Sequence, residues 1–162
     1  MNPPLPAGQA PLASGPAPSP GVVAIVDDDP HIAQALSQWL EFQGLRAACH
    51  LSGESLLRAV HDENGQCTLS AGAGNPAAAR LTGAVLDLNL PGISGFELAA
   101  ALRRLAPGLP LVNITALQPE ERARYGAPPP GVPCLKKPFD LDTLEDALLP
   151  LLCDSMPAQS NP

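Results

Sequence analysis

The sequence is short of aromatic and basic residues. Aromatic residues make up 3% of the chain, so a folded core has to be built from aliphatic side chains. The 9 Lys and Arg residues stand against 16 Asp and Glu residues, which gives a formal net charge of −7. No basic cluster is larger than a pair, whereas a nucleic-acid-binding surface normally needs a basic patch. We therefore expect no nucleic-acid partner.

Long apolar runs are missing as well. No uninterrupted apolar stretch approaches the ~18 residues that span a bilayer, and the N-terminus lacks the basic and apolar segments of a signal peptide. The 4 cysteines, Cys49, Cys67, Cys134 and Cys153, form no C-x-x-C pair and have no histidine at metal-ligand spacing. Such scattered cysteines are typical of free thiols in a reducing compartment. We therefore expect a cytoplasmic protein with no membrane association, disulfide framework or zinc site.

The chain is long enough for one folded domain with low-complexity ends. Its 162 residues and 45% hydrophobic content fit a single globular unit. Residues 1–20 contain 7 prolines and are expected to form a disordered tail, with a Pro-rich ligand for another protein as the alternative. We expect the folded domain at 21–152, a low-complexity insertion at about 64–80, and a second tail at 153–162.

Apolar runs and helical periodicities alternate along the domain. Apolar runs typical of buried parallel strands occur at 22–26, 45–50, 83–88, 109–115 and 132–136. Helical spacing occurs between and after them, at 31–44, 53–62, 94–106, 118–125 and 140–152. Asp29, Ser52 and Asp140 are candidate N-caps, and Gly44 is a candidate helix stop. This alternation predicts an open, doubly wound parallel sheet with helices on both faces.

The predicted strand ends collect polar residues that stand out from their apolar surroundings. These residues are Asp27, Asp28, Asp29, Asp87, Thr115, Lys136 and Lys137. Because the carboxyl ends of parallel strands meet at one edge of a sheet, we expect these side chains to lie together. An unpaired buried carboxylate is costly, so Asp87 is expected to be paired, hydrogen-bonded or bound to a metal.

Such a cluster suits metal-dependent phosphoryl chemistry. Carboxylate oxygens are ligands for Mg²⁺, which keeps several waters when bound by one or two carboxylates. An ammonium group and a hydroxyl on neighbouring strand ends are suited to hold phosphoryl oxygens. An aspartate can act as a nucleophile and form an acyl phosphate, and Asp87 is the candidate for that role.

The motifs at these strand ends resemble those of a known family. The motifs "VAIVDDDP" (23–30), "VLDLNLPGISG" (85–95), "ITA" (114–116) and "KKPF" (136–139) are similar in kind and order to those of bacterial response-regulator receiver domains. The resemblance covers about residues 21–150. Each motif alone is common, whereas all of them in order, at predicted strand ends, form a specific signature. The resemblance implies a flavodoxin-like fold with a five-stranded sheet in the order 2-1-3-4-5.

The resemblance also implies a role for individual residues. Asp87 would accept a phosphoryl group from the phosphohistidine of a histidine kinase, and Thr115 and Lys137 would contact that group. The implied Mg²⁺ ligands are Asp28, Asp87 and the backbone carbonyl of Asn89, with Asp27 acting indirectly. The peptide bond between Lys137 and Pro138 is often cis in the family.

The resemblance implies a phosphorelay switch rather than an enzyme. Its partners would be a sensor histidine kinase and either a downstream protein or a histidine phosphotransfer protein. The surface of the fourth helix, fifth strand and fifth helix would bind the partner or form a homodimer. Few residues follow the last predicted helix, so we expect a stand-alone receiver without an output domain.

Two departures from the family pattern affect the switch. Cys134 stands where the family usually has Tyr or Phe, a ring that moves when the threonine engages the phosphoryl group. The proline-rich stretch 118–133 predicts a short or irregular fourth helix, because proline removes a backbone donor and restricts φ.

Two other functions remain open at this stage. Haloacid-dehalogenase-like phosphatases also use Asp, Mg²⁺, Thr or Ser, and Lys, but their nucleophile lies on the first strand in a D-x-D pattern. Here the acidic pair comes first and Asp87 later. A pseudo-receiver would bind partners without phosphorylation, and the presence of Asp87, Thr115 and Lys137 argues against it.

Overall fold

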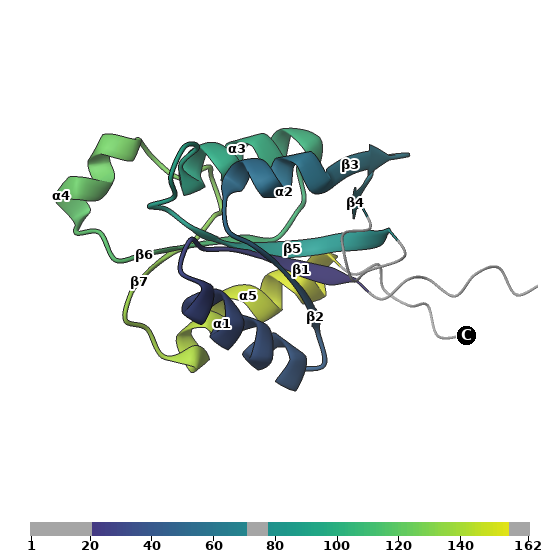
Figure 1. Cartoon of the computed structure of the whole chain (residues 1–162), viewed down its shortest axis with the longest axis horizontal. Coiled ribbons are helices and arrows are strands. Elements are labelled where there is room, and N and C mark those ends of the chain that lie inside the picture. The colour runs from purple at the N-terminus through teal and green to yellow at the C-terminus, as the bar shows by residue number, and fades with distance from the viewer. Residues whose placement is uncertain (1–20, 71–77, 156–162) are drawn as a thin grey trace, which may run out of the picture.

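Five parallel strands form the centre of the computed structural model, which describes residues 21–70 and 78–155 (Figure 1). They are β1 (Val22–Val26), β2 (Arg46–His50), β5 (Ala79–Asp87), β6 (Leu111–Thr115) and β7 (Cys134–Lys136). Their pairing gives the order β2-β1-β5-β6-β7. This is the 2-1-3-4-5 order of a flavodoxin-like sheet, so the predicted fold class is confirmed.

Helices cover both faces of the sheet. Helices α1 (Pro30–Phe42) and α5 (Leu141–Ser155) pack on one face, and α2 (Gly53–Ala59) and α3 (Gly95–Leu105) pack on the other (Figure 1). Along β1, Val23 and Ile25 pack against α1 and α5, and Ala24 packs on the opposite face, with α2 and α3. A strand covered on both faces has no solvent-facing positions, which explains its unbroken apolar sequence.

Local capping determines where the helices begin and end. Asp29 Oδ1 accepts the backbone N–H of His31 at 2.9 Å, and Ser52 Oγ accepts that of Ser55 at 3.2 Å. Gly44, just beyond α1, has a φ of +77°, a conformation that glycine adopts without strain. These three capping predictions are confirmed. At the start of α5 the backbone carbonyl of Asp140 accepts the N–H of Thr143 at 3.0 Å.

The prediction of a helix over 53–62 is wrong for its last three residues, 60–62. Helix α2 ends at Ala59, and an antiparallel hairpin follows, built from β3 (Val60–Glu63) and β4 (Gln66–Leu69). Its turn, Asn64-Gly65, has φ values of +57° and +80°, which suit a two-residue hairpin turn. Strand β4 then pairs with the beginning of β5, so β5 starts earlier than the predicted 83. The hairpin thereby joins the sheet, which has seven strands within the described residues rather than the predicted five.

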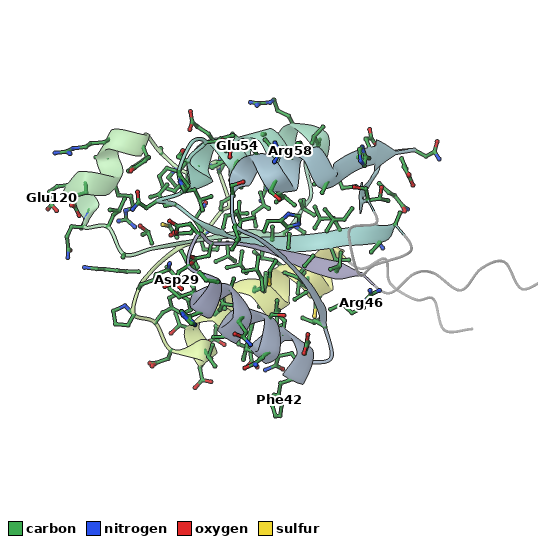
Figure 2. The ribbon with its side chains drawn as sticks, in the orientation of Figure 1. Asp29, Phe42, Arg46, Glu54, Arg58 and Glu120 are labelled. Carbon is green, nitrogen blue, oxygen red and sulfur yellow. The ribbon has the colours of Figure 1, made fainter. Side chains whose placement is uncertain are left out.

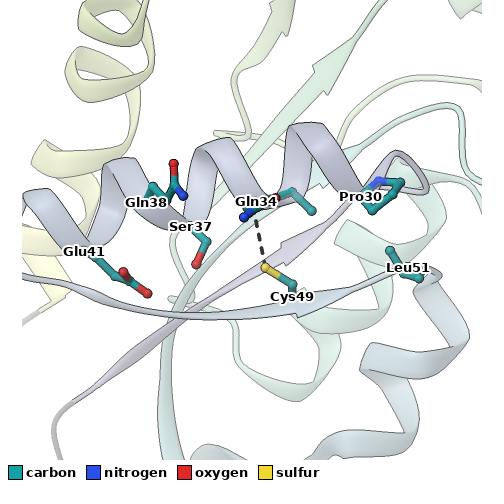
Figure 3. Close-up of a pocket in the computed structure, with 8 residues that line it drawn as sticks. Pro30, Gln34, Ser37, Gln38, Glu41, Cys49 and Leu51 are labelled. Atoms are coloured by element: carbon teal, nitrogen blue, oxygen red, sulfur yellow. Dashed lines mark hydrogen bonds between the residues drawn. The ribbon is translucent and has the colours of Figure 1, made fainter.

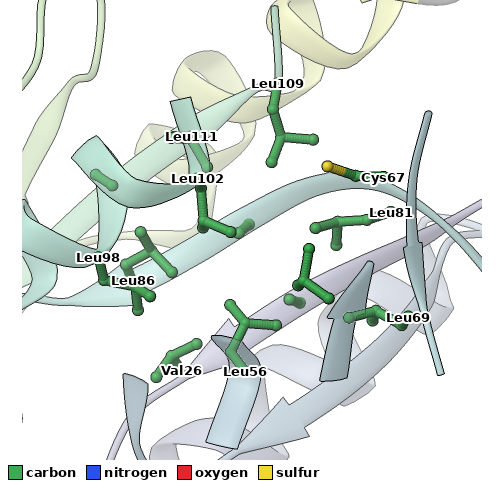
Figure 4. Packing of buried hydrophobic residues seen from close by; sticks show 14 of the residues in the cluster. Val26, Leu56, Cys67, Leu69, Leu81, Leu86, Leu98, Leu102, Leu109 and Leu111 are labelled. Carbon is green, nitrogen blue, oxygen red and sulfur yellow. The ribbon is translucent and has the colours of Figure 1, made fainter. Parts of the chain in front are cut away.

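The hairpin contributes to the core on the α2–α3 face. Cys67 and Leu69 are buried there with Leu56 of α2 and Leu81 of β5 (Figure 4). The apolar side of β4 therefore takes the place that a longer α2 would fill. Part of the predicted insertion at about 64–80 is thus ordered strand, while residues 71–77 lie outside the described part of the chain.

The helical part of the segment between β6 and β7 is short and has no buried residue. It consists of α4 (Pro119–Arg122) and the 3₁₀ turn η1 (Ala123–Tyr125). This confirms the prediction of a short fourth helix. Helix α5 extends to Ser155, past the expected domain end at 152, and the remainder of both predicted tails lies outside the described residues. Within residues 21–70 and 78–155, no helix is long and apolar enough to cross a membrane.

Candidate functional site at the strand ends

The carboxyl ends of β1, β5, β6 and β7 bring the predicted site residues to one edge of the sheet. Asp27 directly follows β1, Asp87 ends β5 and Thr115 ends β6, and all three are buried. Lys137 directly follows β7 and is partly buried. Asp29, at the start of α1, marks this edge in Figure 2. Parallel pairing of the strands is what aligns residues so far apart in the sequence.

Three carboxylates at this edge form a compact oxygen cluster. One oxygen from each of Asp27, Asp28 and Asp87 lies within 4.8 Å of the others. Asp27 and Asp87 are buried, while Asp28 is exposed, so the cluster opens to solvent on one side. Several hard oxygen donors with an open side are the ligand set that Mg²⁺ prefers.

Lys137 is the cation that faces the two buried carboxylates. Its Nζ lies 2.8 Å from Asp27 Oδ2 and donates a hydrogen bond to it. The same Nζ is 3.5 Å from Asp87 Oδ1. Asp27 Oδ1 accepts the backbone N–H of Asp29 at 2.9 Å, so both oxygens of Asp27 have partners. Asp27 is therefore satisfied by the protein itself.

Asp87 is not satisfied in the same way. Its Oδ1 is buried and has no hydrogen-bond partner. Burial raises the pKa of the Asp87 carboxyl above its ordinary value, attraction to Lys137 lowers it, and repulsion from Asp27 raises it again. A buried carboxylate oxygen that lacks a hydrogen bond is costly to keep charged, even with an ammonium group 3.5 Å away. The Asp87 oxygen without a hydrogen bond is thus available to a cation or to a group attached to Asp87.

The Thr115 hydroxyl is positioned so that it can donate a hydrogen bond. Its Oγ1 accepts the backbone N–H of Leu117 at 3.0 Å, and its carbonyl accepts that of Lys137 at 2.6 Å. The Oγ1–H donor is left for another group, because a hydroxyl can donate and accept at once. The Lys137–Pro138 bond is cis, as the family resemblance implies.

The loop from β5 to α3 is tightly built. Ser94 Oγ accepts the N–H of Glu97 and the Glu97 carboxylate accepts that of Ser94, a reciprocal capping box. Glu54 of α2 accepts the N–H of Ile93 at 2.9 Å. A Cβ on Gly95 would overlap the carbonyl oxygen of Asp87, so only glycine lets α3 approach the end of β5 this closely.

Sequence reasoning missed two residues around the site. Glu54 supports the loop after Asp87 from another helix, and no local pattern marks that contact. His50 ends β2, and its carbonyl accepts the N–H of Asp27 at 3.2 Å. Burial lowers the pKa of its ring, whose Nδ1 lies 3.2 Å from Ser55 Oγ. The end of the predicted strand 45–50 was the available signal for His50.

Open pockets on the described surface include one beside the site and one away from it. One, of about 410 Å³, is lined by Ile32, Ala116, Lys137, Pro138 and Phe139, and it adjoins the carboxylate cluster through Lys137. The other, of about 380 Å³, lies between α1 and β2, where Cys49 Sγ is 3.6 Å from the carbonyl of Ala33 (Figure 3). This second pocket contains none of the predicted site residues.

Cys134, where the family usually has an aromatic residue, is half-buried on β7. Arg122 Nη1 of α4 donates to its Sγ at 3.5 Å. The register pairs Cys134 with Asn113, a fully buried residue of β6 whose Oδ1 has no hydrogen-bond partner. The β6–β7 pair therefore carries polar groups at Asn113 and Cys134.

The fold and the site define the class of this protein: a doubly wound α/β domain with a carboxylate and lysine cluster at its strand ends. Residues 77–149 match the family model of the response regulator receiver domain. A receiver domain protein from Methanospirillum hungatei has a similar structure, with a TM-score of 0.63 and 23% identity over 85% of this chain and 97% of that one. The family-model match and the shared fold together support a response-regulator receiver domain in this chain.

Curated relatives are longer proteins. The chain is 31% identical over 126 residues to the dicarboxylate-transport transcriptional regulatory protein DctD of Pseudomonas aeruginosa, covering 78% of this chain and 24% of DctD. It is 29% identical over 133 residues to the probable transcriptional regulatory protein TcrX of Mycobacterium tuberculosis, covering 82% of this chain and 50% of TcrX. The chain thus spans between a quarter and a half of these two relatives.

Proposed function

We propose that this protein is a phosphorylation switch that accepts a phosphoryl group on Asp87 from the phosphohistidine of a sensor histidine kinase. The observation that carries the proposal is the state of the Asp87 carboxylate. It is buried, one of its oxygens lacks a hydrogen-bond partner, and it stands between two further carboxylates and an ammonium group. The match to the receiver-domain family model supports the same assignment.

Mg²⁺ fits the donors at this edge. Asp28, Asp87 and the backbone carbonyl of Asn89 would hold it, and Asp27 would act through water or through Lys137. When bound, the metal supplies positive charge that offsets the repulsion among the carboxylates and draws electrons from a phosphoryl oxygen. The exposed position of Asp28 keeps the metal side of the cluster accessible.

Three side chains of this protein take part in the proposed phosphoryl transfer. An oxygen of Asp87 attacks phosphorus, the nitrogen–phosphorus bond of the donor histidine breaks, and that bond's electron pair returns to the imidazole. Lys137 pairs with the phosphoryl oxygens, and the Thr115 hydroxyl donates a hydrogen bond to one of them. Asp87 is held at the end of a buried strand, so the nucleophile is positioned before the donor arrives.

The expected output is a change in partner binding. A phosphoryl group adds a charge of about −1.5 to −2 at neutral pH, beside Thr115 and Lys137. We propose that this charge alters the surface of α4, β7 and α5, which would bind a downstream protein, a histidine phosphotransfer protein or a second copy of the chain. Action as a stand-alone receiver and a cytoplasmic location remain predictions from the sequence.

The proposal is tested by intact-mass measurement after incubation with acetyl phosphate and Mg²⁺. The wild type should gain one phosphoryl group, and the gain should be lost with EDTA or in Asp87→Ala. Asp146→Ala, which removes an exposed carboxylate from α5, is the matched control and should be phosphorylated as the wild type is. An unmodified wild type would contradict the mechanism and favour a pseudo-receiver. Steady hydrolysis of small phosphomonoesters would favour a phosphatase.

A further inference from the structure

The single tyrosine of the chain reaches the phosphoacceptor edge from η1. Its hydroxyl donates a hydrogen bond to Asn89 Oδ1, with 3.1 Å between the two oxygens. Asn89 is exposed, but its neighbours Leu88 and Leu90 are buried. The backbone at Asn89 is therefore held by the core, and the contact with Tyr125 restrains the side chain.

The other end of the same segment is tied to Thr115. Leu117 donates its backbone N–H to Thr115 Oγ1 at 3.0 Å. Residues 117–125, which we call the α4 strap, thus run from one polar side chain at the strand ends to another. Both anchors lie next to the place where a phosphoryl group on Asp87 would sit.

Between these anchors the α4 strap is held by polar contacts rather than by burial. Lys136 Nζ donates to Gln118 Oε1 and Arg122 donates to Cys134 Sγ. No residue of α4 or η1 is buried, and α4 stands apart from the layered body of the domain in Figure 1. A segment without buried apolar contacts can change position at low cost, so its two anchors have a large share in setting its orientation.

We propose that Tyr125 is a positioning residue of the phosphoacceptor site, whose hydroxyl holds the Asn89 side chain beside Asp87 and couples the α4 strap to occupancy of that site. The inference rests on the proposed function, because it assumes that Asp87 carries a phosphoryl group. Coupling is reciprocal: if occupancy alters the Tyr125–Asn89 contact, the Tyr125 hydroxyl must alter the affinity of the group that occupies the site.

The first test measures the affinity of beryllofluoride, a phosphoryl analogue, in the presence of Mg²⁺. Tyr125→Phe removes only the hydroxyl and should weaken binding about two- to tenfold, the effect of one lost hydrogen bond. In an Asn89→Ala background the same substitution should have no further effect. Glu120→Ala, in the exposed part of the α4 strap (Figure 2), is the matched control and should bind as the wild type does. Unchanged affinity in Tyr125→Phe, or additive effects of the two substitutions, would overturn the inference.

A second readout follows Tyr125 directly. Replacing tyrosine by 3-fluorotyrosine labels one position, so fluorine NMR gives one protein resonance beside those of bound beryllofluoride. The tyrosine resonance should shift on binding in the wild type and should stop responding in Asn89→Ala. Bound beryllofluoride with an unmoved tyrosine resonance would overturn the coupling alone. Absence of bound beryllofluoride from the wild type would overturn the proposed function, and the inference with it.

Discussion

Lys137 Nζ lies 2.8 Å from Oδ2 of Asp27, a carboxylate whose side chain is only 1% exposed. The ammonium thus donates its hydrogen bond to the more deeply buried of the two acids, while Asp87, 3.5 Å from the same Nζ, keeps an oxygen without a hydrogen bond. Asp27 thus helps to stabilise this edge of the sheet through its ion pair, and Asp87 is the carboxylate with an oxygen available for chemistry.

Removing the Lys137 charge should therefore destabilise the metal-free protein. Lys137→Met leaves Asp27 buried beside no cation, and we expect a loss of about 1–3 kcal/mol in the free energy of unfolding. Lys136→Met is the matched control, because that side chain is exposed and its Nζ bonds the neutral Gln118 rather than a carboxylate. Its effect should stay within about 1 kcal/mol. Urea unfolding without metal measures both, and equal stabilities of the two variants would contradict the role given to Lys137.

Asp87→Asn should stabilise the metal-free protein at neutral pH. Burial raises the pKa of Asp87 above its ordinary value of 3.8, so the folded state binds the proton more tightly than the unfolded state. Stability therefore falls as pH rises from the ordinary to the raised pKa and stays lower above that window. Asparagine carries no charge to desolvate. Urea unfolding at several pH values should show the largest gain near neutral pH, shrinking as pH falls; a gain independent of pH would exclude titration of Asp87 as its cause.

Mg²⁺ should stabilise the folded protein through the carboxylate cluster. At a free concentration of 100 times its dissociation constant, the metal should add about 2.7 kcal/mol to the free energy of unfolding. Asp28→Asn removes an exposed carboxylate that we propose as a metal ligand, so its metal-free stability should stay within about 0.5 kcal/mol of the wild type while the stabilisation by Mg²⁺ falls. Thermal unfolding with and without the metal measures the difference. Full stabilisation of Asp28→Asn would remove Asp28 from the ligand set.

Gly95→Ala should disrupt the join between β5 and α3. The added Cβ would overlap the Asp87 carbonyl and lie 2.8 Å from the Cα of Leu88, so backbone atoms must move. Overpacking of this kind costs about 1–3 kcal/mol. Gly108→Ala is the control, because a Cβ there meets nothing within 4 Å. The wild type and both variants are compared by urea unfolding, with Gly95→Ala also tested for Mg²⁺ binding, which should weaken as Asp87 shifts.

Most of the site followed from sequence because a parallel sheet aligns its strand ends. Once 22–26, 83–88, 109–115 and 132–136 are read as strands, Asp27, Asp87, Thr115 and Lys137 must share an edge, whatever the connecting loops do. The hairpin after α2 could not be found from helical spacing, since the helical pattern of 53–59 continues through 60–62. The Asn64-Gly65 pair was the overlooked signal, because both residues suit positive φ.

The sequence by itself determined the class of fold, the strand ends and the residues gathered there. Periodicity and capping act over a few residues, and parallel pairing of the strands then brings their ends to one edge of the sheet. Only the tertiary structure decided which carboxylate accepts the Lys137 hydrogen bond, how Glu54 supports the loop after Asp87, and that Tyr125 meets Asn89. These contacts join side chains from separate loops and helices. Their geometry depends on how whole layers pack, which no local pattern encodes.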